Sequence, residues 1–247
     1  MPDESSPSGC CTIRMLSTLA LMGAMPQLAS RYGEQSGVRL AADFAPTNAL
    51  IERIRSGESA DVAILTRQGV DELSREGIFA SDTCSDIALS FIGIAVRHGA
   101  PRPNIASAQA CRAALLDARS IAYSRIGASG VFFAQLIKQL GIEQRVNARA
   151  RIVPGGFTAK LVADGEADLA VQQVSELMVV PGIDVVGRFP IEWHQGALFS
   201  AGVFAASSHR AAAIDLLRFL GSAEAAPLLR ASGLEPPDPL ARTLESA

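Results

Sequence analysis

The sequence has few of the residues on which metal sites, disulfides and common catalytic motifs depend. Its 247 residues include 4 cysteines, 3 histidines and 1 tryptophan, and aromatic residues make up only 5% of the chain. The cysteines show neither the CxxC spacing nor the Cys/His spacing of a zinc site, and two of them, Cys10 and Cys11, are adjacent. We therefore expect no bound metal and no structural disulfide.

A basic excess and long apolar runs are also missing. The 22 lysines and arginines are outnumbered by 25 acidic residues, so the chain lacks the positive footprint of a nucleic-acid-binding protein. The longest uncharged runs, Met15–Ser30 and Trp193–Ser208, are 16 residues long. A membrane span needs about 20. With 49% hydrophobic and 19% charged residues, the composition is that of a folded globular protein.

The first residues lack the positive charge of a secretory signal. Residues 1–9 contain Asp3 and Glu4 but no lysine or arginine, so we expect a flexible leader and a cytoplasmic protein. A second interpretation takes Arg14 as the charge and Met15–Met25 as the apolar part of a signal. A natural precursor that carries a signal would place the protein in the periplasm.

Short apolar runs alternate with helical patterns, which predicts an α/β fold with a parallel sheet. Pro26 fits its helical pattern poorly and should kink the helix or move its start. The strands are expected at residues 12–16, 38–45, 62–65, 87–97, 120–123, 149–153, 169–173, 185–187 and 198–205. The helices are expected at residues 18–32, 48–56, 68–76, 108–116, 129–140, 157–164, 210–220 and 223–231.

Two of these strands, 87–97 and 198–205, are long enough to be shared between two halves of the molecule. If the chain crosses at about Phe91 and returns at about Phe199, lobe 1 consists of residues 10–90 plus 200–247 and lobe 2 of residues 91–199. Both lobes have the size of a compact unit, and a cleft between two lobes commonly holds a small ligand.

Polar and glycine residues follow nearly every predicted strand that leads into a helix. Helix N-termini bind anions through their unpaired N–H groups, so these junctions are candidate ligand contacts. Any single junction is more often an ordinary helix cap or turn than a ligand contact. The candidates in these junctions are Ser17, Thr18, Thr47, Asn48, Ser124, Ser129, Gly130, Gly155, Gly156 and Phe157.

Three further residues are candidates for direct chemistry. Arg125, just past a strand end, has the geometry to clamp a carboxylate, or it is a solvated loop arginine. Gln172 ends an apolar strand and either faces the cleft or bonds to backbone at a sheet edge. Tyr123 is a candidate proton carrier. Further candidates for that role are Ser17, Thr47 and His194.

Motifs of established enzyme classes are absent, since the chain has no GxSxG, GxxxxGK, HExxH or GxGxxG. Paired carboxylates are missing as well. Asp43 and Asp61 belong to strands, and Glu176 lies beyond the strand at 169–173. We therefore do not expect hydrolysis by two carboxylates.

Several segments resemble the molybdate-binding protein family of ABC importers, whose members have the type II periplasmic-binding-protein fold. The motifs Gly57-Glu58-x-Ala60-Asp61-Val62 and Gly165-Glu166-Ala167-Asp168 are the most specific of them. The resemblance implies two α/β lobes, a central cleft and two hinge crossovers, and it covers residues 12–236. The matching segments are residues 16–19, 44–50, 57–65, 73–77, 164–171, 181–187 and 219–226.

The resemblance also implies where an anion is bound. Ser17 matches the family's first hydroxyl, Ser129-Gly130 match its helix start on lobe 2, and Gly155-Gly156-Phe157 match the next junction. Two positions depart from the family, because Thr47-Asn48 replace a serine pair and Gln172 replaces a tyrosine. A molybdate ligand is therefore not implied, whereas a site for some anion is.

A further resemblance is carried by the segments at residues 16–18, 47–50, 64–66, 154–157 and 172–173. In these segments the chain is similar to a branch of this fold family that contains aconitate isomerase. Two hypotheses follow. The first is a solute-binding protein that clamps a small oxyanion or carboxylate, and the alternative is a cofactor-independent isomerase of a small polycarboxylate. A sensor domain of a LysR-type regulator fits less well, because no helix-turn-helix segment precedes the domain. We expect a monomer with a small anionic ligand, no cofactor and no nucleic acid, and an ABC permease as partner if the chain is exported.

Overall fold

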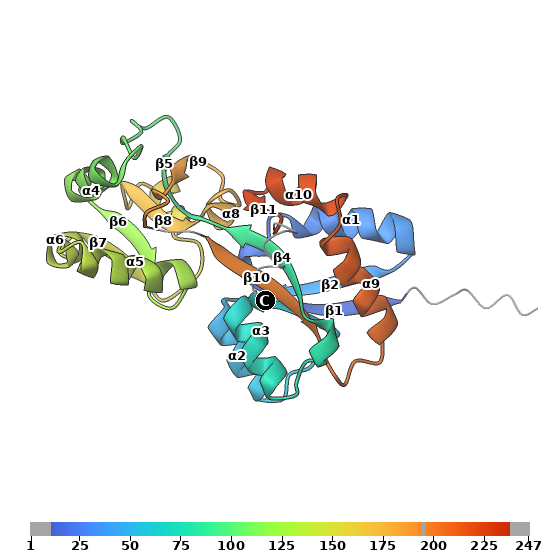
Figure 1. The fold of residues 1–247 in the computed structure, drawn as a ribbon. Helices are drawn as coiled ribbons and strands as arrows, with labels where there is room; N and C mark the ends of the chain where they lie inside the picture. The colour runs from blue at the N-terminus through green and yellow to red at the C-terminus, as the bar shows by residue number, and fades with distance from the viewer. Residues whose placement is uncertain (1–10, 194–195, 238–247) are drawn as a thin grey trace, which may run out of the picture.

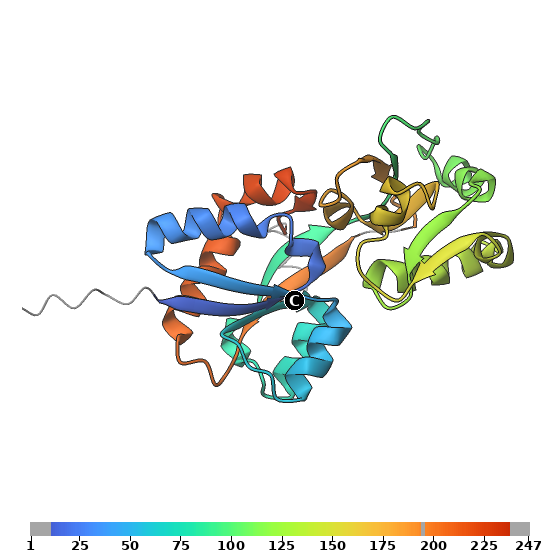
Figure 2. The same cartoon turned by 180° about the vertical axis from the view of Figure 1, so that it is seen from behind.

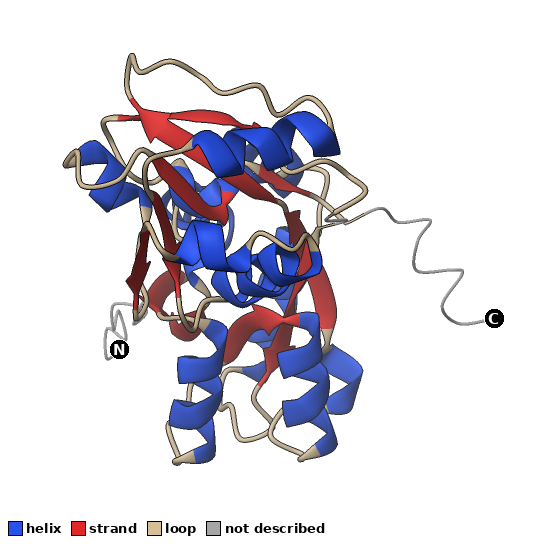
Figure 3. Ribbon diagram, turned by 90° about the vertical axis from the view of Figure 1, so that its left-hand side faces the viewer, coloured by secondary structure: helices blue, strands red, loops and turns tan. Residues whose placement is uncertain are grey.

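The computed structural model describes residues 11–193 and 196–237, which form two β-sheets, each covered by helices on both faces (Figure 1; Figure 3). The predicted leader 1–9, Cys10 and His194 lie outside the described residues. The α/β fold predicted from the sequence is confirmed. Within the described part of the chain, no helix is long and apolar enough to cross a membrane.

The first sheet has the strand order β11-β4-β10-β3-β1-β2. Its first three strands along the chain pair in parallel, and β10 pairs antiparallel with both β3 and β4. The parallel sheet expected from the sequence holds for β1, β2 and β3, but the sheet as a whole is mixed, because β10 and β11 run the opposite way to their neighbours. The strands are β1 (Thr12–Ser17), β2 (Arg39–Phe44), β3 (Val62–Thr66), β4 (Ser85–Ser90), β10 (Ala197–Val203) and β11 (Leu234–Glu235).

Apolar side chains on both faces of this sheet are buried under helices, as expected for a central sheet. One face packs against η1 (Leu19–Leu21), α1 (Met25–Ser36), α9 (Arg210–Leu220) and α10 (Ala225–Ala231). The other face packs against α2 (Thr47–Arg55) and α3 (Arg67–Arg75), which lie below the sheet in Figure 1. A short turn of helix, η2 (Ser81–Thr83), precedes β4.

The second sheet has the strand order β7-β6-β8-β5-β9. Strand β6 pairs in parallel with β7 and β8, whereas β5 pairs antiparallel with β8 and β9. Its strands are β5 (Ile92–Arg97), β6 (Ile121–Ser124), β7 (Ala150–Val153), β8 (Leu169–Gln173) and β9 (Ile183–Arg188). Its helices are α4 (Ala108–Asp117), α5 (Ala128–Gln139), α6 (Glu143–Asn147), α7 (Ala159–Ala163) and α8 (Val174–Leu177).

The chain passes between the two sheets at two places, both visible from behind in Figure 2. The single strand predicted at 87–97 is two strands, because β4 belongs to the first sheet and β5 to the second, with Phe91 between them. The return passage falls between Arg188 and Ala197. Phe199 already pairs with Thr66 of the first sheet, so it is not a crossing residue.

Pro26 moves the start of the first long helix and does not kink it. This is one of the two outcomes expected from the sequence. The predicted helix at 18–32 is replaced by the short η1 and by α1, which begins at Met25 with the proline in its first turn. Proline is tolerated there because the N–H it lacks has no partner in the first turn. Met15 is buried in β1, so the stretch that the second interpretation takes as the apolar part of a signal begins in a strand of this structure.

Candidate functional site

A small pocket lies between the two sheets, at the carboxyl ends of strands from both. Its volume is about 30 Å³. The first sheet and its connections contribute Thr18, Leu19, Pro46, Thr47 and Phe199. The second contributes Ser124, Gly127, Ala128, Ser129, Gly156, Gln172, Gln173 and Glu176. The volume is close to the share of one water molecule, so a larger ligand requires the two units to move apart.

The first sheet presents two buried threonines to this pocket. Thr18 follows β1, and its backbone N–H donates to Ile64 O at 2.9 Å, which holds it between β1 and β3. Thr47 is the first residue of α2, and its Oγ1 accepts a hydrogen bond of 3.4 Å from the Thr66 N–H. Because this oxygen acts as an acceptor, its own hydrogen stays available to donate to a ligand.

The second sheet presents the N-terminus of α5. Gly127 caps this helix of 12 residues, and Ala128 and Ser129 follow in its first turn. The first amides of a helix have no partner inside the helix and carry a partial positive charge. Since α2 also begins at the pocket, the N-termini of two helices from different sheets meet there. This arrangement is suited to an anion.

Gln172 is held by a complete set of hydrogen bonds. Its Oε1 accepts from the Thr158 N–H at 2.8 Å and from Thr158 Oγ1 at 2.9 Å, and its Nε2 donates to Gly156 O at 2.9 Å. Gln172 and Thr158 are both buried. The glutamine therefore fixes the loop before α7 against the end of β8, and this loop brings Gly156 to the pocket.

The two other polar groups on this side, Gln173 and Glu176, differ from Gln172. Gln173 is 2% exposed, and neither of its amide atoms has a hydrogen-bond partner among residues 11–193 and 196–237. Glu176 lies on α8 and is 8% exposed. Burial raises the pKa of the Glu176 carboxyl to about 7, although a hydrogen bond with the Gln172 side chain works in the opposite direction.

Six of the residues that the sequence suggested line this pocket, and seven do not. The six that line it are Thr18, Thr47, Ser124, Ser129, Gly156 and Gln172. The seven that lie outside its lining are Ser17, Asn48, Tyr123, Arg125, Gly130, Gly155 and Phe157.

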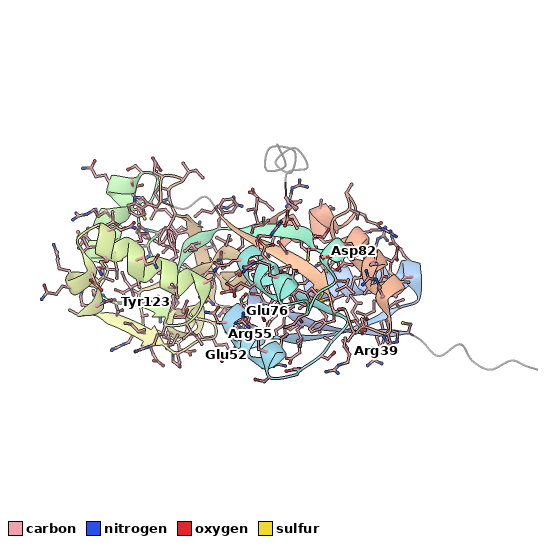
Figure 4. The ribbon with its side chains drawn as sticks, turned by 60° about the horizontal axis from the view of Figure 1, so that its bottom comes forward. Arg39, Glu52, Arg55, Glu76, Asp82 and Tyr123 are labelled. Carbon is pink, nitrogen blue, oxygen red and sulfur yellow. The ribbon has the colours of Figure 1, made fainter. Side chains whose placement is uncertain are left out.

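Ser17 and Tyr123 point away from the pocket for identifiable reasons. The Ser17 hydroxyl is fully buried and donates to Thr18 O at 3.2 Å. Tyr123 lies among the elements of the second sheet (Figure 4), where its hydroxyl donates to Asn147 Oδ1 at 2.7 Å and its ring packs edge-on against Phe133. Burial raises the pKa of Tyr123. We therefore do not propose Tyr123 as the proton carrier.

Three other candidates lie outside the pocket lining, two of them exposed and one packed against the core. Arg125 is exposed, and only its backbone is anchored, by donation of its N–H to Val153 O at 2.7 Å. Asn48 is exposed on α2. Phe157 packs against the core beneath α7, beside Lys160.

Sequence reasoning chose Gln172 alone from the pair Gln172-Gln173, and it did not include Glu176 among the pocket residues. A signal was present, because a glutamine pair at the end of a buried strand is followed within one helical turn by an acid in an apolar sequence. An acid at such a position is buried by the tertiary structure. A helix of four residues is too short for its hydrophobic periodicity to show which of its side chains are buried.

A larger cavity of about 870 Å³ lies at the far side of the second sheet, between the segment 96–104, α4 and residues 165–169. None of the candidates lines it. Several of its charged side chains are paired, since Arg119 contacts Asp168 at 2.9 Å and His98 contacts Asp184 at 3.0 Å. We therefore take the smaller pocket, with its unpartnered polar group, as the functional site.

The family described as bacterial extracellular solute-binding protein matches residues 13–235. This chain belongs to that family. The membership that the sequence suggested is thereby confirmed. Among curated proteins, this solute-binding protein is 37% identical over 231 residues to an aconitate isomerase from a Pseudomonas species, a match that covers 91% of this chain and 88% of the relative.

Solved structures resemble this solute-binding protein in fold. The Azotobacter vinelandii periplasmic molybdate-binding protein matches with a TM-score of 0.77 and 17% identity, over 92% of this chain and all of the other. A periplasmic thiamin-binding protein matches with a TM-score of 0.71 and 16% identity, over 91% and 83% of the two chains. These likenesses confirm the two-lobed periplasmic-binding-protein fold.

Proposed function

We propose that this solute-binding protein clamps a small anion, a carboxylate or an oxyanion, between two lobes. The observation that carries the proposal is the meeting of the N-termini of α2 and α5 at one pocket lined by buried hydroxyls. Partial positive charge at both helix ends favours a negatively charged ligand. Neither lobe holds these groups alone, so binding favours approach of the lobes.

The lobes of this proposal follow those expected from the sequence, residues 10–90 with 200–247 and residues 91–199, except that β10 (Ala197–Val203) belongs wholly to lobe 1. Their hinges are the two passages between the sheets. The first is centred on Phe91, whose carbonyl accepts a hydrogen bond of 2.8 Å from the Val174 N–H, and the Arg188 guanidinium lies 4.1 Å from its ring centre. Such short segments can absorb the rotation that opens a two-lobed clamp.

We propose isomerisation of a small polycarboxylate as a second function of the same pocket. The observation that favours it is the identity of 37% with an aconitate isomerase over nearly the whole chain, together with a buried acid in the pocket. Plain binding of an anion does not need that acid. Exclusion of water by the two lobes would protect a reactive carbanion-like state from side reactions.

The partners and location follow from these proposals. The family's description as extracellular supports the periplasmic alternative, in which the protein delivers its ligand to an ABC permease. Because both halves of the pocket come from one chain, we propose a monomer. Sedimentation of the purified protein and fractionation of the native cells test these two points.

Titration calorimetry of the purified protein with trans-aconitate, citrate, molybdate and sulfate tests the binding function. We expect micromolar or tighter binding of at least one of these anions. Thr47→Val and Ser129→Ala, one from each side of the pocket, should each weaken binding about tenfold, the value of one hydrogen bond. Asn48→Ala, an exposed neighbour of Thr47, is the control that should bind normally. Folded protein that binds none of the four anions contradicts the proposal.

A further inference from the structure

The carboxyl group of Glu176 has no role in simple anion binding. It lines the pocket together with Thr18 from the first sheet and Ser129 from the second. Among the residues that the structure describes, it is the only ionisable side chain in this lining. An ionised carboxylate beside a bound anion is repelled by it, so a pocket for anions alone would be better without this side chain. Its presence points to chemistry.

The surroundings of Glu176 are those of a proton carrier. Burial is the largest cause of its raised pKa, about 7, and no charged group contributes to that shift. Both the acid and the carboxylate are therefore present near neutral pH, which is the condition for general acid–base catalysis. An ion pair with arginine or lysine would have kept the group ionised.

Gln173 supplies a second and independent observation. It follows Gln172 directly, but the Gln172 amide is bonded to Gly156 and Thr158, whereas both amide atoms of Gln173 lack a hydrogen-bond partner in the part of the chain that the structure describes. The side chain is 2% exposed and lines the same pocket as Glu176. Buried polar groups are nearly always hydrogen-bonded in folded proteins, so this amide is available for polar atoms of a ligand.

We propose that Glu176 is the catalytic residue that moves a proton between two carbons of a bound unsaturated polycarboxylate, and that the Gln173 amide holds an oxygen of the carboxylate beside the reacting carbon. This inference rests on the isomerase function proposed above. It assigns the proton transfer to a residue of α8 instead of Tyr123 or a junction hydroxyl.

The proposed step is balanced without any co-reactant. The Glu176 carboxylate takes a proton from the methylene carbon next to the double bond, and the electron pair of the broken C–H bond forms a new C=C bond. The electrons of the old C=C bond move onto the far carbon and its carboxylate, where the Gln173 N–H donates to the charged oxygen. Glu176, now an acid, returns the proton to that far carbon. One C–H bond is broken, one is formed, and nothing is oxidised.

Proton NMR in D₂O with trans-aconitate tests this step. Wild-type protein should form the cis isomer, and deuterium should enter the ligand to the extent that Glu176 exchanges its proton with solvent before returning one. Glu176→Gln should still bind the ligand in calorimetry, while isomerisation and exchange fall by about 10²–10⁴-fold. Glu176→Asp, which keeps a carboxyl group, should retain part of the rate. Glu52→Gln, an exposed acid on α2 labelled in Figure 4, is the matched control and should behave as wild type.

The outcomes separate this inference from the functions on which it rests. Glu176→Gln that is folded by circular dichroism and isomerises at the wild-type rate overturns the role of Glu176 and leaves isomerisation in place. Wild-type protein that binds trans-aconitate without isomerisation or exchange contradicts the isomerase function, and with it the inference, while anion binding stands. If Glu176→Gln does not fold, Glu176→Asp provides the test. A fall in its isomerisation rate no larger than its fall in ligand affinity also overturns the role of Glu176.

Discussion

Gly130 in the first turn of α5 lies so close to the end of β6 that a methyl group on it would stand 1.8 Å from the carbonyl oxygen of Ser124. The same methyl group would stand 2.6 Å from Ser124 Oγ. This contact is with backbone, which cannot move aside cheaply. The absence of a side chain at Gly130 therefore lets the helix start close to the strand end, with Ser124 and Ser129 both in the pocket.

Gly130→Ala should accordingly destabilise the protein and weaken ligand binding together. We expect the free energy of unfolding to fall by about 1–3 kcal/mol, the usual cost of overpacking. Urea unfolding and calorimetry measure the two effects. Gly155→Ala is the control, because its methyl group would be 3.7 Å from the nearest atoms of Ile126, an ordinary contact. Equal stability of the two variants would contradict the importance of the close approach.

Glu176 should make the stability of the protein depend on pH. Its pKa is raised from 4.5 to about 7 by burial, so between these values the folded chain holds a proton that the unfolded chain has released. Stability therefore falls as the pH rises through this interval, by on the order of 3 kcal/mol.

The variant Glu176→Gln isolates this contribution, since an amide does not titrate. Its free energy of unfolding minus that of the wild type should increase between pH 5 and pH 8 in urea titrations. Parallel stability curves for the two proteins would show that the carboxyl group is not shifted in the folded state.

Tyr123→Phe should leave binding and isomerisation within about twofold of wild type, because the hydroxyl bonds to Asn147 and not to the pocket. The loss of that hydrogen bond should cost about 0.5–1.5 kcal/mol of stability. Ligand titration, NMR rates and urea unfolding provide the three measurements. A large loss of rate at unchanged stability would restore Tyr123 as a catalytic candidate.

Thr158→Val should loosen the loop that carries Gly156. Valine has the shape of threonine but cannot donate to Gln172 Oε1, so a buried acceptor loses one of its bonds. We expect a loss of about 1–3 kcal/mol in stability and weaker ligand binding. Thr158→Ser keeps the hydroxyl and should recover most of the binding. Equal behaviour of the two variants would show that the hydroxyl does not hold the loop.

The alternating order of strands and helices was predictable because buried strands are short apolar runs that differ clearly from helical patterns. The division of the stretch 87–97 at Phe91 was not, since both halves are equally apolar and only the pairing partners distinguish them. The start of α1 was indicated by Pro26, whose ring is compatible with a first turn only.

Within the site, the positions of the strand ends predicted where the pocket lies, but they did not predict well which side chains line it. Thr18 and Thr47 could be found because a hydroxyl at the start of a helix is a recognisable pattern. Ser17 could not be separated from Thr18, because consecutive residues at a strand end point in opposite directions. The acid after the glutamine pair was a signal for Glu176, but its burial depends on tertiary contacts of α8, among them the contact with η1 of the other sheet, which the sequence pattern does not show.

The short helix α8 belongs to the second sheet but touches the first. Ser175 contacts Ser90 of β4 at 3.2 Å through their hydroxyls, and a methyl group on Gly233 would meet Met178 at 2.7 Å. Opening of the two lobes must break these contacts between α8 and the first sheet, and it must expose the Glu176 carboxyl group to water. Hydration favours the ionised form of the carboxyl group, so opening would lower its pKa and favour proton release near neutral pH, and closing would favour proton uptake.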